Sequence, residues 1–302
     1  MEQPVRADHG VAVVRKPKGR AGRKTAPYLL SLPGYFWLIV FFLIPLVTML
    51  SLSLQTGDVL HGYTLTWNWG EFGNQLSLHS TEFIRSIVYA GIATLICLVV
   101  SFPVSYWIAF HGGNYKNFFL LMLLVPFFVS FVIRSLAWQF LLSDQGILLG
   151  TLKNLHLIPQ DFHILATSTA VIAGIAYNYL PFTALPLYVA LERIDYRLVE
   201  AAGDLYCSRR EAFLRVVLPL CIPGIFAAFL LTFVPAVGDY LNQQILGGVS
   251  NTMIGTIIQT DFLVNQDYPA ASALSAILLL GVLIGIFLYG RLLGSRTIEE
   301  YV

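Results

Sequence analysis

Charged side chains are scarce in this sequence. Asp, Glu, Lys and Arg make up 12% of its 302 residues, whereas 57% are hydrophobic and the mean hydropathy is +0.72. So much apolar surface exceeds what one soluble core can bury, which predicts a multi-pass membrane protein surrounded by membrane lipid. The net charge of +1 gives no overall attraction to a polyanion, so nucleic acid is not an expected partner.

Catalytic and metal-binding patterns are also missing. The three cysteines, Cys97, Cys207 and Cys221, show neither paired spacing nor a neighbouring His cluster, which argues against a disulfide framework and a metal site. All six His residues fall outside the interiors of the apolar segments, and no H-E-x-x-H pattern occurs, which disfavours an intramembrane hydrolase. The sequence has no G-x-x-x-x-G-K-[ST] phosphate loop, so a partner must handle any ATP. We therefore expect a subunit that is not an enzyme and holds no cofactor.

Six windows are long and apolar enough to cross a bilayer. A hydrocarbon core of roughly 30 Å needs about 20 apolar residues in a helix, because backbone polar groups find no water there. The sequence therefore predicts an all-α membrane protein with six transmembrane helices. These windows are Tyr28–Leu54, Phe83–Phe110, Phe118–Leu142, Ile164–Leu191, Leu220–Tyr240 and Ala270–Leu293. Prolines inside the first five windows predict kinks.

Lys and Arg are unevenly divided between the two sides of the predicted membrane domain. With six spans, the N-terminal arm, the second and fourth connections and the C-terminal tail share one side, which holds fifteen of the 18 basic residues. The positive-inside rule places that side in the cytoplasm. The opposite side carries mainly Asp and Glu. We therefore expect a cell-membrane protein with both termini in the cytoplasm.

The same pattern divides the chain into three segments. A basic arm over residues 1–27, rich in Arg, Lys, Gly and Pro, is expected to be cytoplasmic and disordered. The membrane domain covers residues 28–293, and a short cytoplasmic tail covers 294–302. The first apolar window is too long for a signal-peptide core and no A-x-A site follows it, so it is interpreted as a retained anchor.

The connection over residues 191–219 is charged and patterned. Apolar residues at i, i+3, i+4 and i+7 from Leu198 predict an amphipathic helix whose opposite face presents Glu200. Ser208 and Glu211 have the spacing of a capping box, which predicts the start of a second helix. This two-helix hairpin either simply joins two spans or is gripped by something outside the membrane.

The hairpin resembles the cytoplasmic signature of ABC-importer permeases, which reads E-A-A, three residues, G, nine residues, I-x-L-P. The matching residues are Glu200, Ala201, Ala202, Leu218 and Pro219, with Val216 in place of Ile. Tyr206 stands where the family has Gly, a residue that readily adopts positive φ, so we expect the turn to differ. The resemblance implies a type I ABC-importer permease fold, and it assigns coupling to an ATPase to these residues together with Asp204 and Ser208.

The same resemblance implies a set of partners. In that family the hairpin inserts into a separate ATP-binding subunit, and closure of two such subunits turns the pathway from inward-facing to outward-facing. A second, non-identical permease subunit would complete a heterodimer. An extracytoplasmic substrate-binding protein would deliver the solute.

Two further stretches resemble a narrower group, the spermidine/putrescine permeases. They are PFFVSFVIRSLAW at 126–138 and YNYLPFTALPLYVALERID at 177–195. The resemblance covers the chain from about Tyr28 to Leu293, and it implies that the protein forms half of a polyamine pathway. A permease for another small solute is the alternative, because relatives with similar motifs carry other solutes. A self-contained ion-coupled transporter is disfavoured because it leaves the hairpin without a purpose.

A polyamine pathway requires separated carboxylates and aromatic faces, because the solute is a methylene chain with several ammonium groups. The candidates for the pathway or its gate are Arg134, Trp138, Tyr177, Asn178, Asp239 and Tyr240. Asn178 either lines the pathway or joins helices by a hydrogen bond. Arg134 and Asp239 lie at similar depths in their predicted spans, which suggests an ion pair that shuts the outer gate. Snorkelling of Arg134 to the outer headgroups is the alternative.

Overall fold

The computed structural model describes residues 26–297, with side-chain surroundings for residues 31–291. The basic arm predicted over 1–27 therefore lies outside the described residues, apart from the two residues that begin the first helix. The tail predicted over 294–302 is described only as far as Thr297, where it continues the last helix. The chain divides into two compact units, residues 1–48 and 49–302, and each is described by itself.

The first unit is an apolar helix that changes its winding. Helix α1 (Ala26–Leu38) passes through a π-helical turn, η1 (Ile39–Leu43), into α2 (Ile44–Leu52), whose last residues belong to the second unit. The π turn ends at Leu43, two residues before Pro45, which cannot donate the backbone hydrogen bond of a regular α-helix at this point. Large side chains such as Phe36 and Trp37 are exposed, as expected for a helix that faces lipid.

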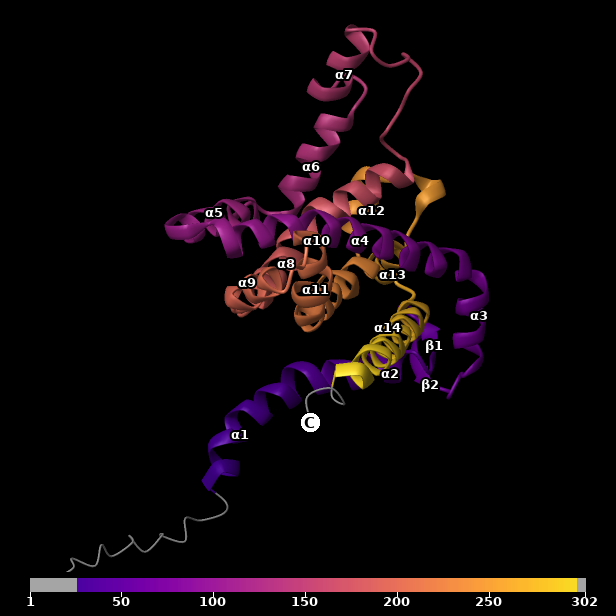
Figure 1. Cartoon of the computed structure of the whole chain (residues 1–302). Coiled ribbons are helices and arrows are strands. Elements are labelled where there is room, and N and C mark those ends of the chain that lie inside the picture. Colours follow the sequence, from indigo (N-terminus) through magenta and orange to yellow (C-terminus); the bar gives the residue numbers. More distant parts are fainter. Residues whose placement is uncertain (1–25, 298–302) are drawn as a thin grey trace, which may run out of the picture. The chain divides into compact units, whose positions relative to one another are not determined.

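Three long helices form the core of the second unit (Figure 1). They are α4 (Ser80–His111), α8 (Ser168–Glu192) and α11 (Leu218–Val237). Their contacts use small residues: a Cβ placed on Gly224 of α11 would come within 2.2 Å of the Cβ of Ala190 on α8. Close approach through small side chains is how helices gain packing energy in a membrane, where lipid competes with apolar contacts.

Helices α4 and α8 run side by side in the same direction and are joined by a row of hydrogen bonds. The donors are side chains spaced four residues apart on α4, and the acceptors are backbone oxygens spaced four residues apart on α8. The pairs are Cys97 Sγ to Ala176 O at 3.1 Å, Ser101 Oγ to Leu180 O at 3.5 Å and Ser105 Oγ to Ala184 O at 2.9 Å. We call these three pairs the α4–α8 ladder.

The third predicted span is broken. Residues 118–142 were expected to form one helix, but they fold as α5 (Lys116–Leu124), a 3₁₀ turn η3 (Val125–Phe128) and α6 (Phe131–Leu142). The helical stretches before and after the break meet at 87°. Pro126 lies in the 3₁₀ turn, and Val129 and Ser130 have extended ψ angles, so the kink predicted for this window is a complete break in the helix. Helix α7 (Ile147–Asn154) follows α6.

The other five predicted spans are present as long apolar helices. Counted within the described residues, five helices are long and apolar enough to cross a membrane, or six if the bent pair makes one crossing. The five are Ser31–Leu52, Ser80–His111, Ser168–Glu192, Arg209–Val237 and Tyr268–Arg291. The last of them belongs to α14 (Tyr268–Thr297). An all-α membrane architecture is therefore confirmed.

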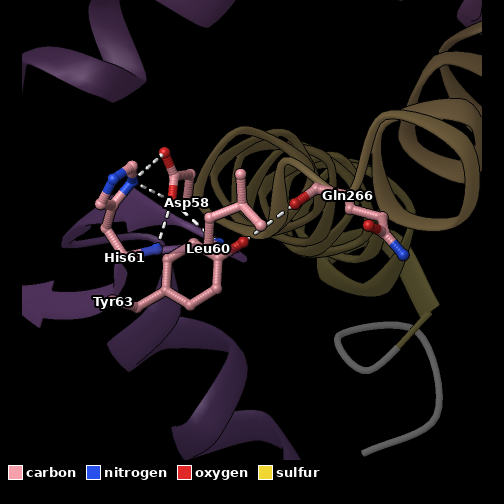
Figure 2. Close-up of polar contacts among 5 residues, drawn as sticks. All are labelled: Asp58, Leu60, His61, Tyr63 and Gln266. Carbon is pink, nitrogen blue, oxygen red and sulfur yellow. Dashed lines mark hydrogen bonds and ion pairs between the residues drawn. The ribbon is translucent and has the colours of Figure 1, made fainter.

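A small β-hairpin was not predicted in the first connection, which the positive-inside rule assigns to the outer side. Strands β1 (Gln55–Asp58) and β2 (Gly62–Leu65) pair antiparallel, and α3 (Gly70–Leu78) follows them. At the turn, Asp58 Oδ1 accepts hydrogen bonds from the backbone N–H groups of Leu60 (3.0 Å) and His61 (2.6 Å), and His61 Nδ1 lies 2.9 Å from the carboxylate (Figure 2). The Tyr63 hydroxyl donates to Gln266 O at 2.9 Å, which ties this hairpin to the loop before α14.

The remaining elements lie between α11 and α14. They are α12 (Leu241–Leu246), the 3₁₀ turn η5 (Val249–Asn251), α13 (Ile254–Thr260) and the π turn η6 (Asp261–Asn265). Helix α12 is short but its Leu246 is fully buried, and it packs against α6 and α8. The break after α11 therefore brings a polar segment back into the protein interior.

Candidate functional site

The charged connection folds as the predicted two-helix hairpin. Helix α9 (Tyr196–Asp204) is capped by Asp195, whose Oδ1 accepts from the N–H of Arg197 at 3.0 Å. Helix α10 (Arg209–Ala212) continues through a π turn, η4 (Phe213–Val217), into α11. The predicted capping box is confirmed: Ser208 Oγ accepts from Glu211 N–H at 3.3 Å, and Glu211 Oε2 accepts from Ser208 N–H at 2.9 Å.

The turn between α9 and α10 keeps the backbone that glycine would favour. Tyr206 has φ +60°, in the left-handed region. Its N–H donates to Gly203 O at 3.0 Å, and the N–H of Cys207 donates to Ala202 O at 3.0 Å. These two bonds define a Schellman motif, in which the left-handed position is usually Gly. The expected change in the turn is therefore absent from the backbone, and Tyr206 adopts the conformation despite its side chain.

The apolar stripe predicted on α9 faces mostly outward. Leu198 and Leu205 are exposed, as is Ala201, and only Ala202 of the stripe is buried. Half-buried Val199 is the other residue that turns toward the core cluster of α8 and α11. A loop that merely joined two spans would gain nothing by exposing this stripe, whereas a docking surface would use it.

The other predicted coupling residues are accessible. Glu200, Asp204 and Ser208 are exposed, and Glu200 makes no ion pair with any residue in the described part of the chain. Leu218 is half-buried and Pro219 exposed at the start of α11. The hairpin thus presents charged and apolar side chains together.

A buried polar cluster lies where α6, α8 and α12 meet. Its members are Ser135 on α6, Asn178 on α8, Asn242 on α12, and Asp239 between α11 and α12. Asn178 Nδ2 donates to Asn242 Oδ1 at 2.9 Å and to Ser135 Oγ at 3.1 Å, and Ser135 Oγ donates to Asn242 Oδ1 at 3.0 Å. Asn178 is fully buried, so it joins helices. We call this group the polar cluster.

Asp239 is the charged end of the polar cluster. Its carboxylate accepts from the side chain of Asn242 at 2.5 Å and from the backbone N–H of Asn242 at 3.1 Å, and the Tyr179 hydroxyl lies beside it. Its side chain is almost fully buried, yet within the described residues no Lys, Arg or His comes within ion-pair distance. A buried carboxylate without a counter-charge is costly, and at this position hydrogen bonds from Asn242 and Tyr179 offset part of that cost.

Arg134 does not pair with Asp239. It is 7% exposed, and its guanidinium lies over the rings of Phe127 and Phe131, 5.2 and 5.7 Å from their centroids. Its Nε and Nη1 atoms are buried without a hydrogen-bond partner. The predicted ion pair is thus not formed. The bend before α6 places Arg134 at an aromatic cavity of about 410 Å³, and the carboxylate of Asp239 is hydrogen-bonded to Asn242 instead.

Two predicted aromatic residues come together at the edge of the polar cluster. The rings of Trp138 on α6 and Tyr177 on α8 lie 5.4 Å apart in a T-shaped arrangement. Tyr177 is 36% exposed and Tyr240 is 38% exposed, so both remain accessible from outside the chain. Trp138 and Tyr177 thus pack against each other across the contact between α6 and α8.

Sequence reasoning missed Ser135 and Asn242, which hold the polar cluster together. One signal was available: the run Asn242, Gln243, Gln244 follows an apolar span directly, and amides at such a position must be bonded if they are buried. Ser135 gave no comparable signal, because serine is common in membrane helices as a packing residue.

The chain matches a known family over most of its membrane domain. Residues 101–296 fit the model of the "binding-protein-dependent transport system inner membrane component" family. The chain belongs to this family of transport permeases. It is 35% identical to the spermidine/putrescine transport system permease protein PotB of Haemophilus influenzae over 258 residues, which cover 85% of this chain and 90% of that protein. It is 32% identical to PotB of Escherichia coli K12 over 266 residues, covering 87% and 97%.

Solved structures support the same fold. The permease is similar to a chain of a bacterial ABC transporter that imports the polysaccharide alginate, with a TM-score of 0.69, 18% identity, and coverage of 90% of this chain and 96% of that one. It also resembles a chain of the MetNI methionine ABC transporter, with a TM-score of 0.53, 16% identity, and coverage of 76% and 98%. The protein is therefore a multi-pass permease subunit of the ABC-importer fold.

Proposed function

We propose that this permease forms half of a translocation pathway for polyamines such as spermidine and putrescine. The observation that carries the proposal is Asp239, a buried carboxylate that lacks a cationic partner in the described chain. An ammonium group supplies that charge, and charge-assisted hydrogen bonds are the strongest polar contacts available. The substrates in the names of the PotB relatives point to the same class of solute.

Aromatic residues near Asp239 suit the rest of the solute. Tyr179 lies beside the carboxylate, and Trp138, Tyr177 and Tyr240 offer further partly accessible rings. Methylene chains pack on aromatic faces, and ammonium groups are attracted to them. Because Asp239 is shielded here, the pathway must open for it to meet the solute. This is expected of a carrier that alternates between two states.

Uptake by the complete importer tests the solute class. Proteoliposomes holding the complex are given labelled spermidine or putrescine, with unlabelled neutral and anionic solutes as competitors. We expect polyamine uptake that the other solutes do not inhibit, and Asp239→Asn should reduce it by about tenfold or more, since a hydrogen bond to a charged group contributes roughly 1.5–3 kcal/mol. Transport of a neutral or anionic solute that spermidine does not inhibit would assign the permease to another solute.

The hairpin of α9 and α10 is the second part of the proposal, because it couples transport to ATP. A separate ATP-binding subunit grips the exposed side of the hairpin through Glu200, Ala201, Asp204, Tyr206 and Ser208. Ala202, Leu218 and Pro219 set its position against α11. The support is the exposure of the stripe and of Glu200 together with the matched signature.

Charge reversal at Glu200 tests the coupling. In assembled complexes, Glu200→Lys should abolish stimulation of ATP hydrolysis by the solute and reduce transport at least tenfold. Asp161→Lys, an equally exposed reversal in the connection between α7 and α8, is the matched control and should leave both rates unchanged. Normal coupling in the Glu200→Lys complex would reject the assignment.

The assembly and its orientation complete the proposal. A second, non-identical permease subunit forms the other half of the pathway, a substrate-binding protein docks on the outer face, and the hairpin and both termini lie in the cytoplasm. Single cysteines placed at Arg210 and Asp161 in a Cys207→Ser background test the orientation. An impermeant maleimide added to right-side-out vesicles should label position 161 and spare position 210. The reverse pattern would invert the topology.

A further inference from the structure

Tyr206 stands at a position where no contact within the described part of its own chain accounts for a tyrosine. It is 98% exposed at the tip of the hairpin, and its backbone has φ +60°. Positive φ is unfavourable for a residue with a Cβ and is readily adopted by glycine. Within the described residues, the ring has no aromatic neighbour and the hydroxyl makes no hydrogen bond. The backbone bonds of the turn hold this conformation, but no contact of the side chain within the described residues accounts for a tyrosine here.

The tip of the hairpin is held firmly although it is exposed. Only Leu205, Tyr206 and Cys207 separate the end of α9 from the cap of α10 at Ser208. The Schellman bonds fix the first side of this segment, and the capping box fixes the second. The direction in which Tyr206 projects is thus set before any partner arrives, which lowers the entropy lost on binding.

The neighbouring side chain makes the tip more apolar. Leu205 is 77% exposed and directly precedes Tyr206. The surrounding hairpin is charged, with Asp204 and Arg209 on either side of the tip. Both of these side chains are exposed, as is Leu205. An apolar tip with a charged rim is the usual composition of a binding hot spot, where a buried aromatic residue supplies most of the affinity.

We propose that Tyr206 is an aromatic anchor that enters an apolar recess on the ATP-binding subunit, with Leu205 packed beside it. The inference rests on the proposed coupling role of the hairpin and adds the residue that carries its affinity. The ATP-binding subunit is the partner because Tyr206 lies between the two halves of the signature that the hairpin shares with ABC-importer permeases. Glycine at this position would relax the backbone but would contribute no contact.

Substitutions that keep the backbone and remove the ring test the proposal. Glycine and asparagine both tolerate the left-handed conformation, so Tyr206→Gly and Tyr206→Asn should leave the hairpin folded. Binding of the ATP-binding subunit to the permease in nanodiscs is measured by biolayer interferometry. We expect both variants to bind at least tenfold more weakly, as for loss of a hot-spot aromatic residue, and Tyr206→Phe to stay within about threefold of the wild type.

Two further measurements separate folding from docking. Hydrogen exchange at the amides of Tyr206 and Cys207 should be no faster in Tyr206→Gly than in the wild type. Tyr115→Ser removes another exposed tyrosine, in the connection between α4 and α5, and should not change the affinity. Wild-type affinity in Tyr206→Gly, while Glu200→Lys still uncouples transport, would overturn the anchor and leave the coupling role standing. Unchanged coupling in both variants would instead reject the hairpin as the docking site.

Discussion

The hairpin of α9 and α10 and the polar cluster are both polar sites, but they are built over different sequence distances. The bonds of the hairpin join residues two to five positions apart, as in the capping box between Ser208 and Glu211. The bonds of the polar cluster between α6, α8 and α12 join residues 43, 64 and 107 positions apart. The hydrogen bonds of the hairpin therefore need no partner from elsewhere in the chain, whereas those of the cluster exist only when three helices have already packed.

This difference predicts that the largest damage comes from breaking the polar cluster. Asn242→Leu removes the side-chain bonds to Asp239, Asn178 and Ser135. The buried Asp239 carboxylate then loses its amide donor and keeps only backbone N–H groups and the Tyr179 hydroxyl. We expect a loss of roughly 2–4 kcal/mol in the free energy of unfolding, measured by denaturation in mixed micelles or nanodiscs. Gln244 is exposed on the same helix, so the control variant Gln244→Leu should change the free energy of unfolding by less than about 0.5 kcal/mol. Equal stabilities would mean that the cluster does not join the helices.

Loss of a cap in the hairpin should have a smaller and more local effect. Ser208→Ala removes the acceptor for the N–H of Glu211, which should cost about 1 kcal/mol. Amides over 205–212 should exchange about fivefold faster, while the overall unfolding transition stays nearly unchanged because the hairpin lies outside the core. Ser208→Thr keeps the acceptor and serves as the control. A lower midpoint for the whole subunit would show that the hairpin and the core unfold together.

The smallest effect is expected at the outer β-hairpin, which is also locally bonded. The side-chain and backbone hydrogen bonds from His61 hold the pKa of the Asp58 carboxyl below its ordinary value. The folded turn thus favours the charged carboxylate. Its contribution to the stability of the turn is fully present above the ordinary pKa of Asp, and it is lost as the pH falls through the lowered pKa of Asp58. Exchange at the amides of Leu60 and His61 should accelerate in that acidic range. Asp58→Asn should remove this pH dependence, and a dependence that persisted would point to another group.

The same contrast explains which features could be predicted from sequence. Apolar length gave five of the spans, and local spacing gave the capping box at Ser208, because those signals depend on neighbouring residues. A kink in the third window was predicted from its proline, but a complete break at Pro126 was not, since proline is tolerated inside the helices α8 and α11 of this same protein. Proline alone does not say whether neighbouring helices will keep a segment straight.

The pairing of Arg134 with Asp239 failed for a related reason. Counting residues along straight helices placed the two side chains at similar depths, but α6 follows an 87° bend and cannot be located by that count. Ser135 and Asn242 entered the polar cluster because the bend and the short helix α12 bring them together, and neither event is visible in local sequence. The Tyr206 turn was misjudged from residue type, since the two backbone bonds of its Schellman motif outweigh the preference of the side chain.

The α4–α8 ladder has a mechanical consequence. Its acceptors are the backbone oxygens of Ala176, Leu180 and Ala184. They lie on both sides of Pro181, which removes a backbone hydrogen bond from α8, so the bonds from α4 support the helix where it would otherwise bend. With this support, α8 resists bending at Pro181 when a force acts on one of its ends. Asn178 lies thirteen residues from Leu191, about 20 Å along the helix axis, and Leu191 adjoins the hairpin. In the proposed coupling, a displacement of the hairpin would therefore move α4 and α8 together at the level of the buried amides.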